Sequence, residues 1–256
     1  RKRSSAASDV YKRQGFLGYY LLKELLSRGY DVVVADIKDD IEFQNKVHYI
    51  NCDILKQDQV ATVFKYQNYD VVYNLAGFAN LDFSIKDPLK TMHLNIIGNM
   101  HILDACVNAK VQDFVYASSA YAMSNKGSFY GISKLASEKI IEEYHEKYDL
   151  NFTILRYGSV YSERDYDNNY IYNLVKRAVL ENIIDHKGDG KEIREYIHAG
   201  DAAKLSVDVI ESNKFKNVHV ILTGSERMQR FELFNMIKEI LNDKIEVKYN
   251  LNQETN

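Results

Sequence analysis

Tyr130 and Lys134 stand four residues apart in the stretch Ser128–Lys139. On a helix this spacing puts both side chains on one face. A phenol ordinarily titrates near pH 10, and a positive charge held beside it favours the phenolate and lowers its pKa. The pair therefore predicts a general base, although the same spacing is also typical of a solvated helix face. The surrounding elements decide between the two interpretations.

A candidate hydroxyl stands shortly upstream of the pair. Ser119 ends the apolar run Asp113–Ser119, which predicts a buried strand, and a helix is predicted over Phe129–Tyr148. Ligands of parallel α/β sheets bind beyond the carboxyl ends of the strands. Tyr73–Gly77 and Arg156–Tyr157 end two further predicted strands. We therefore expect Ser119 and the pair to meet at this edge of a sheet.

Strands and helices alternate along most of the chain. The predicted strands are 31–36, 47–54, 70–77, 113–119 and 151–157, and the predicted helices are 15–29, 57–66, 88–110 and 129–148. This alternation predicts an α/β fold, a Rossmann-type doubly wound parallel sheet with helices on both faces. After about residue 160 the pattern loosens, with helices predicted near 168–180, 201–210 and 230–241. A smaller C-terminal α/β part is expected there.

The helix predicted over Gly15–Gly29 is entered through glycines and followed by the strand Asp31–Asp36. This is the second half of a βαβ dinucleotide-binding unit. Its first strand and first glycine should lie within residues 1–14, which contain no run of Val, Ile or Leu and have Lys12 where that glycine should stand. Our hypothesis is that residues 1–14 are a non-native segment and that the first strand is missing. The chain is then expected to bind NAD poorly, which calorimetry would test.

Composition and charge exclude several function classes. A hydrophobic content of 46%, a charged content of 27% and a net charge of -3 describe an ordinary soluble protein without a nucleic-acid or membrane-surface partner. Cys52 and Cys106 stand in apolar segments and read as reduced core residues of a cytoplasmic protein. With no CxxC motif or Cys/His cluster, no metal site is expected.

Taken together, these motifs over about residues 15–241 resemble the extended short-chain dehydrogenase/reductase family, in particular its NAD-dependent nucleotide-sugar epimerase/dehydratase group. The resemblance implies a catalytic set of Ser119, Tyr130 and Lys134. Asp36, as the acid that binds the adenosine ribose, favours NAD over NADP. The implied cofactor-binding residues are Gly15, Phe16, Leu17, Gly18, Asp36, Asp53, Ile54, Leu75, Ala76, Gly77, Asn95, Tyr130, Lys134 and Tyr157. The implied substrate-binding residues are Ser119, Ser159, Arg194 and Tyr196.

The resemblance also implies a domain division. An NAD-binding Rossmann domain is expected over 15–160, and a substrate-binding part, truncated and interleaved with it, over 161–256. A nucleotide-sugar substrate is implied. So is a homodimer joined through the helices 88–110 and 129–148. The resemblance leaves the sugar, the nucleotide base and the carbon centre open.

Departures from the family pattern bear on the reaction. Ser159 stands where the family has a substrate-contacting asparagine, and Glu195 where it has an aspartate. Ala120 follows Ser119, so the Asp-Glu pair that 4,6-dehydratases place there is absent. The sequence therefore favours an epimerase that acts by transient oxidation to a keto-sugar. The alternatives are an NAD(P)-dependent nucleotide-sugar ketoreductase and a catalytically silent nucleotide-binding relative.

Overall fold

The computed structural model describes residues 4–9, 15–37, 43, 45–164 and 169–251 of the 256-residue chain. The chain divides into two compact units. The first contains residues 1–157 and 200–222, and the second contains residues 158–199 and 223–256. Each unit is described by itself.

The first unit is built on a seven-stranded sheet in which every pair of neighbours runs parallel. The spatial order is β11-β6-β5-β4-β1-β2-β3. The strands are β1 (Ser4–Asp9), β2 (Asp31–Asp36), β3 (His48–Asn51), β4 (Val71–Asn74), β5 (Asp113–Ser119), β6 (Asn151–Tyr157) and β11 (Val218–Leu222). The strand order reverses between β1 and β4, which is the position where sheets of this class bind ligands. The predicted fold class is confirmed.

The strand β1 corrects one prediction. Ser4–Asp9 pairs with β2 on one side and β4 on the other, in the middle of the sheet. The prediction that the first strand is missing from the sequence is therefore wrong. Small and polar residues make poor strands by propensity alone, but two flanking parallel strands supply hydrogen bonds that override propensity. The non-native origin of residues 1–14 stays a hypothesis, and Lys12 lies outside the described residues.

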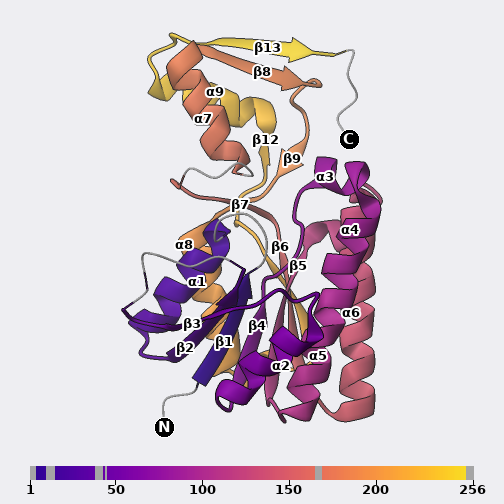
Figure 1. The fold of residues 1–256 in the computed structure, drawn as a ribbon. Coiled ribbons are helices and arrows are strands. Elements are labelled where there is room, and N and C mark those ends of the chain that lie inside the picture. Colours follow the sequence, from indigo (N-terminus) through magenta and orange to yellow (C-terminus); the bar gives the residue numbers. More distant parts are fainter. Residues whose placement is uncertain (1–3, 10–14, 38–42, 44, 165–168, 252–256) are drawn as a thin grey trace. The chain divides into compact units, whose positions relative to one another are not determined.

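Helices cover both faces of this sheet, and Figure 1 shows α1 and α8 on one side and α4, α5 and α6 on the other. Their bounds are α1 (Phe16–Ser27), α2 (Gln57–Tyr66), α3 (Leu81–Lys86), α4 (Pro88–Met92), α5 (Gly98–Asn108), α6 (Ser128–Tyr148) and α8 (Ala199–Asp208). The largest apolar core lies between the sheet and α2, α5 and α6, where Phe114 and Tyr116 of β5 pack against Leu103 and Ile141. This double-sided burial is the reason that the strands read as continuous apolar runs.

The helix predicted over 88–110 is three segments joined end to end. A π-helical turn, η1 (His93–Ile97), separates α4 from α5. Such a turn inserts one extra residue and is frequent at functional sites. Here it contains Asn95, whose backbone carbonyl accepts a hydrogen bond from Ser137 Oγ of α6 at 2.8 Å. Side-chain periodicity does not reveal such an insertion.

The second unit contains shorter elements. These are β7 (Ser159–Tyr161), α7 (Tyr170–Glu181), β8 (Ile183–Lys187), β9 (Ile193–Arg194), β10 (Tyr196–His198), β12 (Met228–Gln229), α9 (Arg230–Ile240) and β13 (Glu246–Asn250). Its own core gathers Leu174 and Ala178 of α7 with Phe234 and Ile237 of α9 around Ile184 of β8. Segment 200–222 returns to the first unit, where β11 forms the sheet edge beside β6. The strand β8 was not predicted.

Two further findings concern the described residues only. None of their helices combines the length and the apolar character needed to cross a membrane. They also contain no group of three or more His, Cys, Asp or Glu side chains arranged to hold a metal ion.

Candidate active site

Tyr130 and Lys134 lie one turn apart on α6, as their spacing predicts. Both side chains are buried, with exposed fractions of 7% for Tyr130 and 3% for Lys134. A solvated helix face is therefore excluded for this pair. The long helix α6 presents them to the carboxyl edge of the sheet, where β5 ends.

Ser119 meets Tyr130 at this edge. The hydrogen bond between their side chains lowers the pKa of the Tyr130 phenol, but burial has the larger effect, and Tyr121 raises it further. Burial thus raises the pKa of Tyr130 to about 12. Ser119 Oγ also accepts a hydrogen bond from the backbone N–H of Tyr121 at 3.2 Å, which fixes the side chain at the start of the short helix η2 (Ala120–Met123).

Lys134 is held by β5. Its Nζ donates to the backbone carbonyl of Ala117 at 2.8 Å and lies 4.6 Å from the centroid of the Tyr116 ring. We expected the ammonium to bring the pKa of Tyr130 below its ordinary value. In the protein the net direction is upward, because removing a phenolate from water costs more than the Ser119 hydrogen bond recovers.

The turn after β4 closes around Asn95. Asn95 Oδ1 accepts from the backbone N–H of Phe78 at 2.7 Å, and Nδ2 donates to the Phe78 carbonyl at 3.1 Å and to Ser133 Oγ at 2.8 Å. Gly77 has a φ of +147°, and a Cβ built there would lie 2.6 Å from Asn95 Oδ1 and 3.6 Å from Lys134 Nζ. Only glycine fits this close approach. Asn95 therefore supports the predicted cofactor turn, and its direct contact with cofactor stays a prediction.

The remaining predicted cofactor residues of the first unit lie at the same sheet edge or at the start of α1. Gly15 caps α1, which has no acidic residue in its first turn and no side-chain cap, as suits a phosphate-binding helix N-terminus. Leu17 and Gly18 follow within that first turn. Phe16 also belongs to α1, but its side chain lies outside the described part of the structure. The residues Leu75 and Ala76 connect β4 to Gly77.

Asp36 and Tyr157 are the last residues of β2 and β6, and Asp53 follows the end of β3. Asp36 ends β2 and is 3% exposed, and its contact with the adenosine ribose stays a prediction. Asp53 Oδ1 accepts from the N–H of Leu55 at 3.0 Å and shapes the turn after β3, in which Ile54 is buried. The Tyr157 hydroxyl bonds Ser206 Oγ at 2.7 Å. A glycine turn, a helix N-terminus entered through glycine and a buried acid fit the parts of a dinucleotide such as NAD.

The predicted substrate residues Ser159, Arg194 and Tyr196 belong to the second unit. The Tyr196 hydroxyl is buried without a hydrogen-bond partner among the described residues. Sequence reasoning missed two residues near Tyr196, namely Tyr170 and Arg230. The guanidinium carbon of Arg230 lies 4.3 Å from the ring centroid of Tyr170. Arg230 and Arg194 both act electrostatically on Tyr196, although burial raises its pKa overall. Tyr170 directly follows Asn168 and Asn169, and this local sequence gave no usable signal.

The parallel sheet with its switch point and the Ser–Tyr–Lys set together define a dinucleotide-dependent α/β enzyme. The profile of the NAD dependent epimerase/dehydratase family matches residues 13–222. The chain belongs to this family, which confirms the resemblance noted from the motifs and the use of NAD.

Individual relatives agree with this assignment. The chain is 26% identical to a putative UDP-glucose 4-epimerase of Methanocaldococcus jannaschii, over 94% of this chain and 84% of that protein. It is 22% identical to a dTDP-D-glucose 4,6-dehydratase of Dictyostelium discoideum, over 90% of this chain and 60% of that protein. The crystal structure of UDP-glucose 4-epimerase from Thermotoga maritima with UDP-glucose shares the fold, with a TM-score of 0.86 and 22% identity, over 96% of this chain and 85% of that one.

Proposed function

We propose that the protein is an NAD-dependent epimerase of a nucleotide-activated sugar that acts by transient oxidation to a keto-sugar. One observation carries this proposal: the Ser119–Tyr130 hydrogen bond, at the carboxyl end of β5, with Lys134 one helical turn away. A tyrosine bonded to a serine hydroxyl next to a lysine is suited, in its phenolate form, to removing a proton from an alcohol.

The side chains divide the work between them. Tyr130, as the phenolate, takes the proton of a sugar hydroxyl, becomes the neutral phenol, and later returns the proton. Ser119 donates a hydrogen bond to the reacting sugar oxygen. Lys134, held by the Ala117 carbonyl, supplies a positive charge one helical turn from Tyr130, and a positive charge beside a phenol favours the phenolate. The burial of Tyr130 and Lys134 keeps this exchange away from bulk water.

NAD, when bound, supplies the acceptor and donor of hydride. Gly15 and Gly18 would hold its pyrophosphate, Asp36 its adenosine ribose, and Gly77 would leave room beneath it. Lys134 Nζ, 3.6 Å from a Cβ built at Gly77, would hydrogen-bond the second ribose.

Epimerisation is favoured over dehydration by the helix that follows Ser119. Expulsion of a sugar hydroxyl needs a further acid or base beside the catalytic serine. The helix η2 has the sequence AYAM and offers no carboxylate. The relative named as a UDP-glucose 4-epimerase supports the same choice, and it makes a UDP-sugar the first substrate to test.

The nucleotide diphosphate is assigned to the second unit. Arg194 and Arg230 each carry a guanidinium, the group best shaped for bidentate contacts with phosphate oxygens. Among described residues neither arginine forms an ion pair with a carboxylate. The unpartnered Tyr196 hydroxyl adds a donor.

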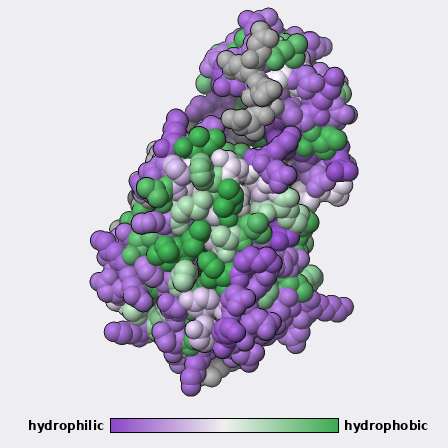
Figure 2. Space-filling model, turned by 90° about the vertical axis from the view of Figure 1, so that its right-hand side faces the viewer, coloured by the Kyte–Doolittle hydropathy of each residue, from purple (hydrophilic) through white to green (hydrophobic). Residues whose placement is uncertain are grey.

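The protein is also proposed to be a homodimer. Figure 2 shows apolar side chains gathered on the face where α4 and α6 lie. Leu89, Ile132 and Leu135 are 76%, 58% and 41% exposed, and Ile97 of η1 is 42% exposed. Apolar residues exposed together on adjacent helices are typical of an interface, and a second copy would extend the packing of α4 against α6 into a four-helix bundle.

The test is turnover of a panel of UDP-, dTDP- and GDP-sugars by the protein supplied with NAD, followed by NMR of the sugar products. The expected result is inversion at one carbon with no net change in NADH absorbance. Net oxidation or reduction of added cofactor would instead establish the ketoreductase, and loss of water from the sugar would establish a dehydratase. Tight NAD binding without turnover of any sugar would identify a silent relative and refute the proposal.

A further inference from the structure

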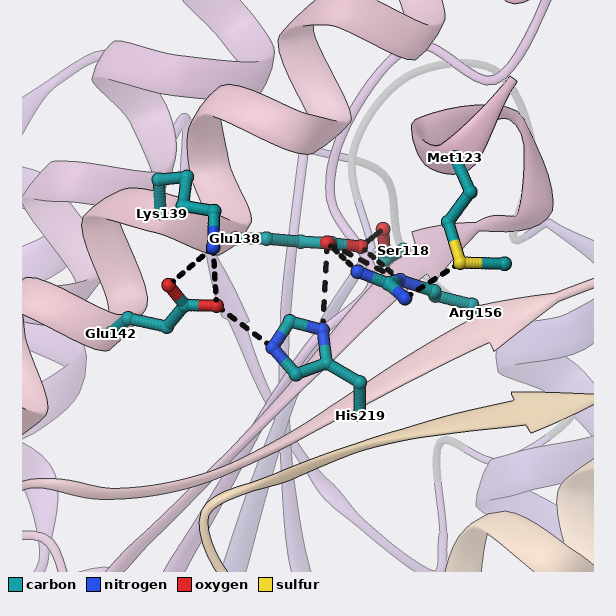
Figure 3. Close-up of polar contacts among 7 residues, drawn as sticks. All are labelled: Ser118, Met123, Glu138, Lys139, Glu142, Arg156 and His219. Carbon is teal, nitrogen blue, oxygen red and sulfur yellow. Dashed lines mark hydrogen bonds and ion pairs between the residues drawn. The ribbon is translucent and has the colours of Figure 1, made fainter.

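Glu138 is a buried carboxylate that the chemistry described above does not use. It lies on α6, and its side chain is 0% exposed. A buried charge is strongly destabilising unless it is paired and hydrogen-bonded. Figure 3 shows that the side chains around it come from α6 itself, from β5 and β6, and from the edge strand β11.

Arg156 of β6 neutralises this carboxylate. Its Nε lies 3.0 Å from Glu138 Oε1, and its Nη2 lies 2.6 Å from Oε2. This is a bidentate geometry, the strongest arrangement of an arginine with a carboxylate. The pairing is also the main reason that the pKa of Arg156 is raised. The carboxylate and β6 are therefore fixed to each other.

Ser118 of β5 is the third side chain of the cluster that Glu138 and Arg156 form. Its hydroxyl donates to Glu138 Oε1 at 2.5 Å, and its register partner across the sheet is Arg156. Ser118 directly precedes the catalytic Ser119. Glu138 lies two helical turns beyond Tyr130 on α6. One carboxylate thus holds the strand end that carries the serine to the helix that carries the tyrosine.

We propose that Glu138 is a positioning residue, which holds the end of β5 to α6 through Ser118 and Arg156 so that the Ser119 hydroxyl stays within hydrogen-bond reach of Tyr130. The kinetic test of this positioning role rests on the proposed function, whereas the titration of Tyr130 does not. Glu138 acts through Ser118, because its carboxylate is bound to Ser118 and Arg156.

The outer side chains of the same cluster provide a matched control. His219 of β11 has its Nδ1 3.5 Å from Glu138 Oε2 and its Nε2 2.9 Å from Glu142 Oε1. Lys139 Nζ pairs with Glu142 Oε2 at 2.7 Å. Glu142 is on the same helix as Glu138 and belongs to the same cluster, but its ion pairs are with Lys139 of α6 and His219 of β11 and not with β5. Glu142→Gln therefore tests whether the loss of any charge in the cluster is enough to change the pKa of Tyr130.

The first readout is the titration of Tyr130 in the NAD-loaded protein, followed by NMR of tyrosines labelled with carbon-13 at Cζ, with Tyr130→Phe to assign the signal. The other titratable or charged groups around the phenol are Tyr116 of β5, Tyr121 of η2 and Lys134 of α6. Because the Ser119 hydrogen bond lowers the pKa of Tyr130, Ser118→Ala is expected to raise it by roughly half a unit to one unit.

Glu138→Asp keeps the negative charge on a shorter side chain, and we expect it to raise the pKa of Tyr130 as Ser118→Ala does. It replaces Ser118→Ala in the test if that variant does not fold. Glu142→Gln should leave the titration unchanged. An unchanged Tyr130 pKa in both Ser118→Ala and Glu138→Asp, or an equal shift in Glu142→Gln, would overturn the positioning role. A lower thermal stability alone would produce no such pattern.

The second readout is kinetic. Ser118→Ala is expected to lower kcat about tenfold near pH 7.5 with a KM within about threefold of the wild type, and to regain activity at higher pH. A kcat with the wild-type pH profile would also contradict the proposal. If the wild-type protein turns over no nucleotide sugar, the proposed function fails, and the titration by itself still decides the role of Glu138.

Discussion

At the scale of single residues, the pairing of Tyr130 with Ser119 carries the chemical argument. Burial raises the pKa of the phenol to about 12, and the Ser119 hydrogen bond acts against that rise. A phenol in this state holds its proton until a partner makes removal favourable. The serine, the lysine and the positive charge that a bound nicotinamide ring would bring are the three groups able to do so.

Replacing Tyr130 with phenylalanine tests this assignment directly. We expect turnover to fall by at least about 10²-fold, because the ring remains while the proton acceptor is lost. NAD affinity should change little, since the pyrophosphate and adenosine contacts lie elsewhere. Steady-state rates and calorimetry measure the two effects. Tyr148→Phe, at the exposed far end of α6, is the control, and equal rates in the two variants would exclude Tyr130 as the base.

At the scale of elements, the π-helical turn η1 has a specific purpose. It places Asn95 where one amide bonds both backbone groups of Phe78 and also Ser133 of α6. The turn therefore fixes the Gly77 loop relative to the helix that carries Tyr130 and Lys134. A regular helix over 88–110 would rotate the residues after the insertion by about 100° per residue.

Asn95→Ala tests whether the π-helical turn η1 supports the Gly77 turn through the Asn95 side chain. The variant leaves a buried N–H and a buried carbonyl of Phe78 without their side-chain partner, and we expect a loss of about 3 kcal/mol in the free energy of unfolding. NAD should bind more weakly because the Gly77 turn loses its support. Urea unfolding and NAD titration measure these effects. Asn108→Ala, at the exposed end of α5, should change neither, and wild-type stability in Asn95→Ala would contradict the role.

The sequence predicted those elements whose own residues determine them. Apolar runs ending in Asp36, Ser119 and Tyr157 revealed β2, β5 and β6, and the Tyr–Lys spacing predicted the face of α6 that meets the end of β5. The strand β1 escaped prediction because its small residues become a strand only between two neighbours. The burial of Glu138 escaped prediction because it depends on Arg156, a partner 18 residues further along the chain.

At the scale of the whole molecule, buried tyrosines couple stability to alkaline pH. Burial raises the pKa values of several of the 20 tyrosines, among them Tyr69, Tyr73, Tyr116, Tyr130, Tyr144 and Tyr157. Each keeps its proton in the folded state at a pH where the unfolded chain has released it. Their contribution is therefore complete below about pH 10, the ordinary pKa of tyrosine, and is lost as pH rises towards the folded-state values.

We accordingly expect the free energy of unfolding to decrease steeply above about pH 10, by about 1.4 kcal/mol per pH unit for each such tyrosine. Urea unfolding at intervals from pH 8 to pH 11 measures the slope. Tyr130→Phe removes one of these groups, so its slope should be shallower by about one proton. A slope that is flat in the wild type, or the same in both proteins, would show that burial does not raise these pKa values.

The apolar face of α4 and α6 sets the last expectation for the whole molecule. If two copies join through it, Leu89 and Ile132 leave water on association, and a charge at either position would be buried against the partner. We expect Leu89→Glu and Ile132→Lys to be monomeric at micromolar concentration, where the wild type sediments as a dimer. Leu180→Glu changes an exposed leucine of α7, outside this face, and should leave the dimer intact. A wild-type monomer, or a dimer unaffected by both charges, would exclude this interface. Leu89 belongs to α4, which continues into η1 with Asn95, and Ile132 belongs to α6 with Tyr130. A monomeric variant that also loses NAD affinity would therefore show that the second copy helps to hold the Gly77 turn in place.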